Sequence, residues 1–105
     1  MGPYSRIPKI AVLGAGYWGI NHVRNYNELG ALAAVCDTSR GSLDEIAARY
    51  PGVRAEPDLD RVLADESIDG VVIATPAETH YTLARRAIDA GKHVLVEKPL
   101  ALDVH

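Results

Sequence analysis

A chain of 105 residues, of which 48% are hydrophobic, is long enough for one domain with a core of its own. The formal net charge of −3 gives no electrostatic reason to expect binding to nucleic acid or to an anionic membrane. The apolar runs are too short to span a bilayer, and the single cysteine, Cys36, excludes an internal disulfide. We therefore expect a cytoplasmic protein whose partners include neither nucleic acid nor a membrane.

The first half of the chain predicts two strand–helix units after a leader at residues 1–8. Residues 10–13 form a continuous apolar run that is typical of a buried strand. Residues 17–29 predict a helix, and Gly30 is well placed to end it. The apolar run at residues 32–36 predicts the second strand.

A capping box predicts the start of the second helix. Ser42 and Glu45 have the spacing at which each side chain satisfies a backbone amide of the other residue. The helix should run from this box to about Tyr50. The next unit has weaker signals, with a short possible strand at residues 53–55 and two helical turns at residues 58–64.

The last third of the chain predicts one more strand–helix–strand unit. Residues 70–74 contain three consecutive β-branched side chains and predict a strand. Residues 75–78, Thr-Pro-Ala-Glu, resemble a second capping box with proline at the first helical position. Gly91 should end this helix, and residues 93–96 predict a last strand. The apolar stripe of the helix comprises Tyr81, Leu83, Ala84, Ala87 and Ile88.

Apolar strands that alternate with helices indicate an α/β protein, with a doubly wound parallel sheet covered by helices on both faces. The connections should be right-handed crossovers. If the turn after the first strand holds a dinucleotide, the five strands have the order 3-2-1-4-5. The ligand crevice then lies between the ends of the first and fourth strands. We expect this domain to cover residues 9–105.

A glycine motif, Gly14-x-Gly16-x-x-Gly19, follows the first predicted strand and opens the first helix. Gly14 would permit the turn, Gly16 would let the backbone approach a pyrophosphate, and Gly19 would let the helix lie close to the sheet. Backbone amides at this helix start, including those of Tyr17 and Trp18, suit a phosphate group. The alternative is an ordinary tight turn between a strand and a helix.

An acidic residue, Asp37, stands where the second predicted strand ends. A carboxylate here can accept hydrogen bonds from both hydroxyls of an adenosine ribose, and it would repel a 2′-phosphate. This favours NAD over NADP and places the neighbouring Thr38 at the site. Arg40 has two alternative roles. It contacts the adenosine end of the cofactor, where it could also hold a 2′-phosphate, or it is a solvated charge on a loop.

Three further segments follow the glycine motif in a characteristic order: Thr75-Pro76-Ala77-Glu78-Thr79-His80, Gly91-Lys92-His93-Val94 and Glu97-Lys98-Pro99. With them, the sequence resembles the Gfo/Idh/MocA oxidoreductases over about residues 8–103. The resemblance implies a Rossmann domain from an NAD(P)-dependent enzyme. Such enzymes transfer a hydride between nicotinamide and a hydroxyl or carbonyl group of a sugar, nucleotide sugar or cyclitol.

The resemblance also implies roles for single residues. Glu97 would bond the nicotinamide ribose, Lys98 would bond the reacting oxygen, and Pro99 would shape their loop. The cofactor crevice would be lined by Thr75, Pro76 and His80. Independently, an ammonium at the end of a strand can polarise a carbonyl or stabilise a developing alkoxide. The alternatives are a surface ion pair between Glu97 and Lys98, and a His80 that bonds only to backbone.

Members of the resembled family continue into a second domain that carries the substrate pocket and the oligomer interface. We therefore expect this chain to be a cofactor-binding part that is inactive alone and forms a homo-oligomer when full length. The alternative is a non-catalytic module that senses dinucleotides, against which the presence of Lys98 argues. No metal is expected, because the histidines lack the spacing of metal ligands.

Overall fold

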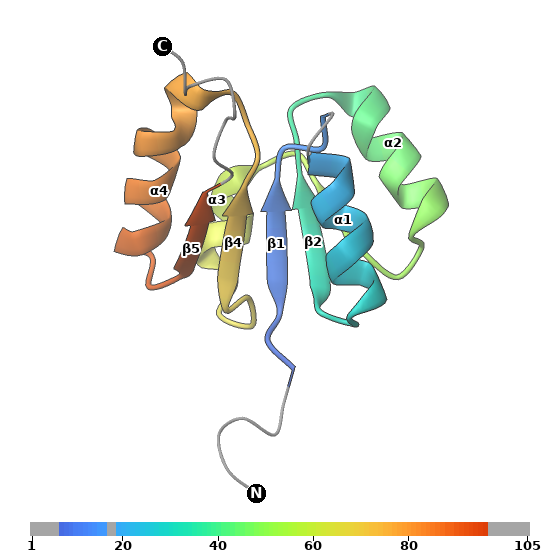
Figure 1. Ribbon diagram of the computed structural model, residues 1–105, viewed down its shortest axis with the longest axis horizontal. Helices are drawn as coiled ribbons and strands as arrows, with labels where there is room; N and C mark the ends of the chain where they lie inside the picture. Colours follow the sequence, from blue (N-terminus) through green and yellow to red (C-terminus); the bar gives the residue numbers. More distant parts are fainter. Residues whose placement is uncertain (1–6, 17–18, 97–105) are drawn as a thin grey trace, which may run out of the picture.

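The computed structural model describes residues 7–16 and 19–96 (Figure 1). The strands are β1 (Ile10–Leu13), β2 (Leu32–Cys36), β3 (Arg54–Glu56), β4 (Gly70–Ile73) and β5 (His93–Val96). The helices are α1 (Gly19–Glu28), α2 (Arg40–Arg49), α3 (Leu59–Ala64) and α4 (His80–Asp89), with a 3₁₀ turn, η2 (Ala77–Thr79), before α4. Each strand and helix that the sequence predicts is present, with small shifts at the ends.

The five strands form one parallel sheet in the order β3-β2-β1-β4-β5, which confirms the predicted fold. In the register of the sheet, Leu13 pairs with Cys36 on one side and with Ile73 on the other. The carboxyl ends of β1, β2 and β4 therefore meet at one edge, toward which their arrows point in Figure 1. The order reverses between β1 and β4, and this is where a doubly wound sheet opens a crevice.

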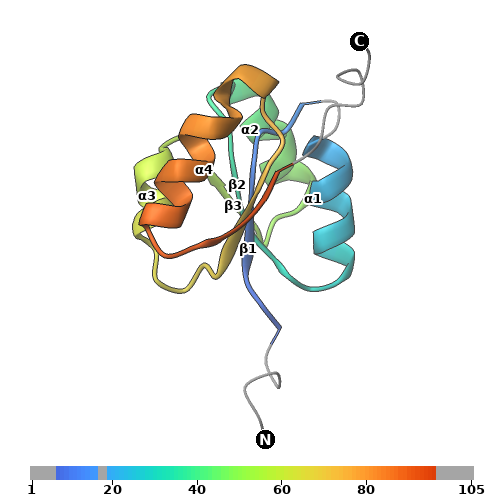
Figure 2. The ribbon, with the colours of Figure 1, turned by 60° about the vertical axis from the view of Figure 1, so that its left-hand side comes forward.

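The apolar runs are continuous because both faces of the sheet are covered. Val12, Val35 and Val72 point to one face, where α1 and α2 pack on the sheet. The next residues along, Leu13 and Ile73 among them, point to the other face, under α3 and α4. Figure 2 shows α3 and α4 on one side of the sheet and α1 on the other. The predicted cover of helices on both faces is confirmed.

The predicted capping box at Ser42 is wrong, because α2 begins earlier. Its N-cap is Ser39, whose side-chain oxygen accepts a hydrogen bond from the amide of Ser42 at 3.2 Å. The amide of Ser39 in turn donates to Asp37 Oδ1 at 2.8 Å. The carboxylate of Asp37 turns the chain as soon as β2 ends, so Ser42 already lies within the first turn of the helix.

The second predicted capping box, at residues 75–78, is also wrong. The N-cap of η2 is Pro76, and no side chain caps that turn. The hydroxyl of Thr75 pairs with the hydroxyl of Thr79 at 2.6 Å, and it makes no capping bond to an amide of this turn. A turn of 3₁₀ helix over Ala77–Thr79 then leads into α4.

The apolar stripe of α4 is narrower than the sequence predicts. Leu83, Ala84 and Ala87 pack against the core, whereas the side chains of Tyr81 and Ile88 are 74% and 62% exposed. The last strand, β5, lies at the edge of the sheet, and of its side chains Val94 packs against the core. A helix beside an edge strand buries a narrower stripe than one over the middle of a sheet.

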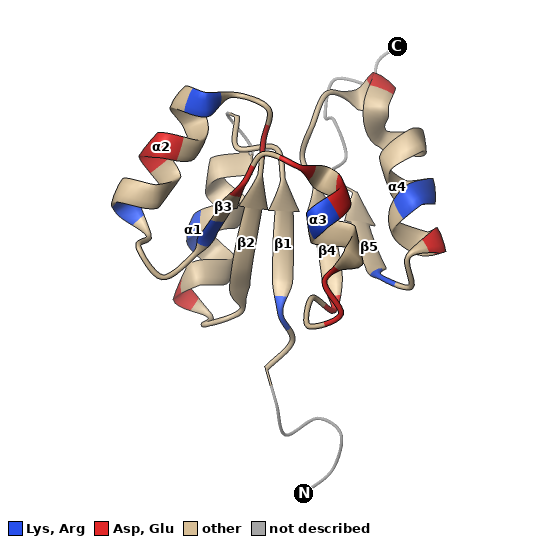
Figure 3. Cartoon of the chain, turned by 180° about the vertical axis from the view of Figure 1, so that it is seen from behind, with Lys and Arg blue, Asp and Glu red and all other residues tan. Residues whose placement is uncertain are grey.

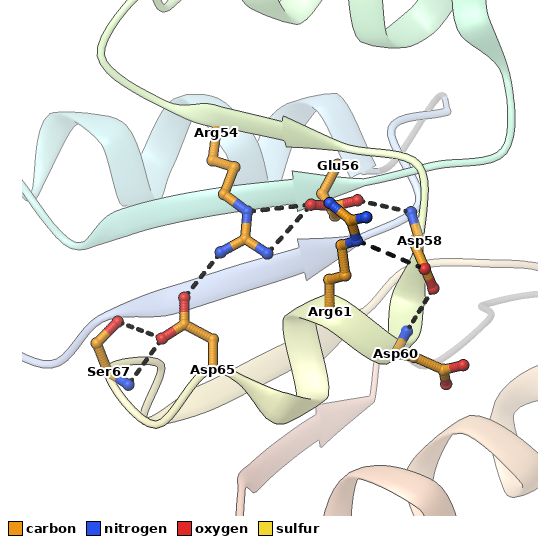
Figure 4. Close-up of polar contacts among 7 residues, drawn as sticks. All are labelled: Arg54, Glu56, Asp58, Asp60, Arg61, Asp65 and Ser67. Carbon is orange, nitrogen blue, oxygen red and sulfur yellow. Dashed lines mark hydrogen bonds and ion pairs between the residues drawn. The ribbon is translucent and has the colours of Figure 1, made fainter.

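Charged side chains hold the third unit, for which the sequence signals are weakest. Figure 3 shows acidic residues along α3 and the segments that flank it, and Figure 4 shows Arg54 between Glu56 and Asp65. The guanidinium of Arg54 donates to Glu56 Oε1 at 3.1 Å and to Asp65 Oδ2 at 2.7 Å. Hydrogen bonds from Ser67, then the contact with Arg54, lower the pKa of the Asp65 carboxyl. These bonds tie the three-residue strand β3 to the turn after α3.

Candidate functional site

A pocket of about 470 Å³ opens at the carboxyl ends of β1, β2 and β4, where the strand order reverses. This volume lies within the range of small-molecule sites. The pocket is lined by Leu13, Gly14, Gly16, Cys36, Asp37, Thr38, Pro57, Leu59, Ala74, Thr75, Pro76, Thr79 and Leu83. The structure thus brings together six of the residues that the sequence singled out: Gly14, Gly16, Asp37, Thr38, Thr75 and Pro76.

The three glycines of the motif have different surroundings. Gly14 has a positive φ of 98°, and a Cβ there would lie 2.9 Å from Thr75 Cγ2. A Cβ at Gly19 would overlap the carbonyl group of Gly14, so α1 approaches β1 more closely than any side chain allows. A Cβ at Gly16 would meet no heavy atom of the described residues within 4 Å. Gly16 therefore leaves open space above the backbone, where a pyrophosphate would approach.

The carboxylate of Asp37 joins the two loops that border the pocket. Its Oδ2 accepts a hydrogen bond from the amide of Ala15 at 2.7 Å, and its Oδ1 accepts one from the amide of Ser39 at 2.8 Å. A carboxylate oxygen accepts two hydrogen bonds, so each oxygen keeps a lone pair for another donor. The sequence identified this residue but not its bond to the glycine loop.

The loop between β4 and α4 is held by three hydrogen bonds from side chains, in addition to the backbone bond from the amide of Thr79 to the carbonyl of Pro76. The oxygens Thr75 Oγ1 and Thr79 Oγ1 lie 2.6 Å apart, and Thr79 Oγ1 donates to the carbonyl of Pro76 at 2.6 Å. His80 Nε2 donates to the carbonyl of Thr75 at 2.7 Å. The ring of His80 thus bonds to backbone, and His80 is not among the described residues that line the pocket, so its predicted contact with the cofactor stays a prediction.

Two other predicted residues lie beside the pocket and do not line it. Arg40 is the exposed first residue of α2, next to the N-cap Ser39. Gly19 lies at the start of α1, behind Gly14. Tyr17 and Trp18 lie outside the described residues, as do Glu97, Lys98 and Pro99, so their predicted roles stay predictions.

Sequence reasoning missed the apolar walls of the pocket and one of its hydroxyl groups. Pro57 and Leu59 come from the start of the α3 unit, and Leu83 and Thr79 come from the α4 unit. The sequence places Leu83 in the apolar stripe of its helix and Leu59 in the two helical turns at residues 58–64. They do pack against the core, and they also reach the pocket because they lie near the ends of their helices that face the site. The sequence signal for this pair of hydroxyl groups was that Thr75 and Thr79 lie four residues apart, one before and one within the predicted helix.

Cys36 lines the pocket as a protonated thiol. Its side chain is buried at the end of β2, and burial, followed by the nearby charge of Glu56, raises the pKa of the thiol to about 11. A thiol with this pKa is a poor nucleophile at neutral pH. Cys36 is thus a buried, free thiol of the core that also borders the pocket.

Within residues 7–16 and 19–96, no helix is long and apolar enough to cross a membrane. The same part of the chain contains no cluster of three or more histidine, cysteine or acidic side chains with which a metal ion could be bound.

A model of an oxidoreductase family with an NAD-binding Rossmann fold matches residues 8–105. The chain belongs to this oxidoreductase family. The resemblance to Gfo/Idh/MocA proteins is confirmed, and the predicted cofactor, NAD, is the one that the family's description names.

Relatives of this Gfo/Idh/MocA domain include two named dehydrogenases. An inositol 2-dehydrogenase from Rhodococcus erythropolis is 44% identical over 90% of this chain and 28% of its own length. A UDP-N-acetylglucosamine 3-dehydrogenase from Acidithiobacillus ferrooxidans is 39% identical over 90% of this chain and 29% of its own length. The chain thus spans less than a third of these relatives.

Among solved structures, GenD2 from gentamicin A biosynthesis, in complex with NAD, superposes with a TM-score of 0.81 at 36% identity. The match covers 97% of this chain and 30% of GenD2. The described sheet and helices are thus those of a Rossmann domain whose relative has been seen with NAD.

Proposed function

We propose that this chain is the cofactor-binding domain of an NAD-dependent dehydrogenase that acts on CH–OH groups. The observation that carries the proposal is the geometry of the pocket. Gly16 lines it, and a Cβ there would meet no heavy atom of the described part of the chain within 4 Å, while the carboxylate of Asp37 stands at the same edge of the sheet. A pyrophosphate needs the first feature, and an adenosine ribose needs the second.

The rest of the pocket supports the same ligand. Leu59 and Leu83 provide apolar surface on the walls, as a flat purine ring requires. Asp37 offers lone pairs to ribose hydroxyls and a negative charge that would repel a 2′-phosphate. We therefore propose that NAD binds more tightly than NADP. Arg40 is exposed beside the N-cap of α2 and is not among the described residues that line the pocket. It therefore makes no contact in the pocket that would favour the 2′-phosphate of NADP.

The chemistry divides between the cofactor and the protein. Bound nicotinamide supplies the acceptor or donor of the hydride. The residues of this chain bind and orient the dinucleotide: Gly14 and Gly16 through their backbone, and Asp37 through its carboxylate. We propose that Lys98 bonds the reacting oxygen of the substrate and that Glu97 bonds the nicotinamide ribose, on the strength of the family resemblance.

We propose a cyclic polyol or a nucleotide sugar as the substrate of the whole protein. The support comes from the two relatives, one named for inositol and one for UDP-N-acetylglucosamine. Both names describe a ring that carries secondary hydroxyl groups, which are the groups that an NAD-dependent enzyme oxidises. We further propose that the protein is cytoplasmic, which the single cysteine supports. The resemblance to the family supports a homo-oligomer for the whole protein.

Calorimetric titration with NAD and NADP tests the proposal on the 105-residue chain. We expect NAD to bind and NADP to bind at least about tenfold more weakly, since a repelled phosphate costs at least about 1.4 kcal/mol. If neither binds, the proposed function fails. If NADP binds more tightly, the role given to Asp37 fails.

Turnover tests the catalytic part of the proposal in a protein that carries this domain at full length. With a panel of inositols and nucleotide sugars, we expect Lys98→Ala to reduce kcat while NAD binding is retained. Unchanged turnover would remove Lys98 from the mechanism. A full-length protein that binds NAD and turns over none of these substrates would favour the alternative, a module that senses dinucleotides.

A further inference from the structure

Two threonine hydroxyls lie together on the β4 side of the pocket. Thr75 follows β4 closely, and Thr79 ends the 3₁₀ turn η2. Both residues line the pocket, and their Oγ1 atoms lie 2.6 Å apart. Thr79 Oγ1 also lies 2.6 Å from the carbonyl oxygen of Pro76, to which it donates.

The direction of these bonds follows from a count of protons. A threonine hydroxyl has one proton to donate, and a carbonyl oxygen only accepts. The proton of Thr79 lies on its bond to Pro76, so the proton between the two threonines must come from Thr75. Thr75 Oγ1 therefore has no proton left for a ligand, and it can only accept a hydrogen bond from one.

Other contacts keep Thr75 in this orientation. His80 Nε2 donates to its carbonyl oxygen at 2.7 Å, which anchors the backbone. The methyl group of Thr75 lies against Gly14, close enough that a Cβ on that glycine would come within 2.9 Å of it. With its methyl group on one side and Thr79 on the other, the hydroxyl has one preferred rotamer.

We propose that Thr79 is a positioning residue that makes Thr75 an obligatory hydrogen-bond acceptor for the base of the bound dinucleotide. The inference rests on the proposed function, because it assumes that a dinucleotide occupies this pocket. The apolar side chains of Leu59 and Leu83 give the base its place, and Thr75 meets its polar edge. The pocket then selects a base that donates there through an amino group, as adenine does, over one that presents a carbonyl, as hypoxanthine does.

A matched pair of ligands tests the selection. NAD and nicotinamide hypoxanthine dinucleotide differ in one exocyclic group, an amine in the first and a carbonyl in the second, with a ring proton to match. We expect calorimetric titration of the 105-residue chain to show NAD binding about tenfold more tightly, because two facing acceptors leave a lone pair unsatisfied.

Variants separate hydroxyl ordering from a simple loss of packing. In Thr79→Val the proton of Thr75 is free to donate, so the affinity ratio of the two dinucleotides should fall to about twofold or less. Thr79→Ser restores the hydroxyl and should restore the ratio. In a Thr75→Val background, Thr79→Val should not change the ratio further. Thr82→Val removes an exposed hydroxyl of α4 that is not in the pocket lining and should leave the ratio as it is.

The outcomes distinguish the two proposals. A wild-type chain that binds neither dinucleotide refutes the proposed function, and the role of Thr79 falls with it. A chain that binds both equally keeps the proposed function and refutes the selection by Thr75. A Thr79→Val variant that keeps the wild-type ratio overturns the positioning role, whatever its effect on affinity alone.

Discussion

Gly19 offers the sharpest test of how the glycine motif acts. Alanine is a better helix former than glycine by up to about 1 kcal/mol, so helix propensity alone predicts that Gly19→Ala stabilises α1. The structure predicts the opposite. The new Cβ would overlap the carbonyl oxygen of Gly14 and lie 2.8 Å from its carbonyl carbon, and both atoms belong to backbone. Neither can turn aside as a flexible side chain would.

The size of the effect follows from what must move. To relieve the overlap, α1 must shift away from β1. This shift disturbs the packing of Val23, a residue of α1 that is fully buried against the sheet. Overpacking of this kind costs about 1–3 kcal/mol. After subtraction of a gain in helix propensity of up to about 1 kcal/mol, we expect a loss of about 1 kcal/mol in the free energy of unfolding. For a domain of this size, that loss lowers Tm by roughly 4–8 °C.

Urea denaturation followed by circular dichroism measures the loss, with Gly52→Ala as the matched control. Gly52 lies in an exposed turn, and among the residues that the structure describes none has a heavy atom within 4 Å of a Cβ placed there. The control should stay within about 0.5 kcal/mol of the wild type, as surface substitutions do. If Gly19→Ala is as stable as the control, α1 does not need the glycine for its approach to β1, and the explanation fails.

Three further predictions concern the pocket. Gly16→Ala should leave the urea midpoint unchanged, since its Cβ enters open space, but it should weaken NAD binding at least about tenfold in calorimetry, because a methyl group fills the place of the pyrophosphate. Asp37→Asn should lower the free energy of unfolding by about 1–2 kcal/mol without ligand, because an amide oxygen replaces only one of the two acceptors that Ala15 and Ser39 require; an unchanged midpoint would contradict this. The raised pKa of Cys36, about 11 against an ordinary 9.0, means that the folded state holds this proton longer than the unfolded state. Stability should therefore be complete below pH 9 and fall by up to about 3 kcal/mol between pH 9 and pH 11, and the fall should be smaller in Cys36→Ala; equal pH profiles would count against it.

The strands and their order could be predicted because the signals for them are local. A strand covered on both faces is an unbroken apolar run, as at Ala11–Leu13 and Val71–Ile73, where every side chain is buried. The order then followed from the glycine motif, since a dinucleotide fold has one arrangement of its first strands. No contact between distant residues had to be known.

The helix starts could not be predicted because they depend on distant or competing partners. Ser42 has a glutamate at the right spacing, but Asp37 holds the amide of Ser39 and moves the cap three residues earlier. Thr75 has the same favourable spacing to Glu78, yet its hydroxyl finds Thr79. A capping motif indicates which hydrogen bonds a side chain is able to make. Which of these bonds forms depends on the conformation of the loop before the helix.

The third unit shows a different limit of the sequence. Arg54 and Glu56 lie two residues apart and share one face of β3. In the sequence alone they look like solvated charges, which are unfavourable in a strand. In the structure Glu56 is 8% exposed, because Arg54 neutralises it and the amide of Asp58 satisfies its second oxygen. The partner that completes the cluster, Asp65, lies beyond α3, so no local pattern could reveal it.

Asp37 shows why the site residues were easier to name than to explain. Its position at the end of β2 pointed to ribose binding, and the residue does line the pocket. In the structure the same carboxylate already ties Ala15 of the glycine loop to Ser39 of the next loop. The loop that would receive a pyrophosphate is therefore held in shape before any ligand arrives, and binding does not have to supply the entropy of ordering it. If Asp37 binds the ribose as proposed, the same carboxylate also holds the loop proposed for the pyrophosphate, and this would link the glycine motif to the acidic residue.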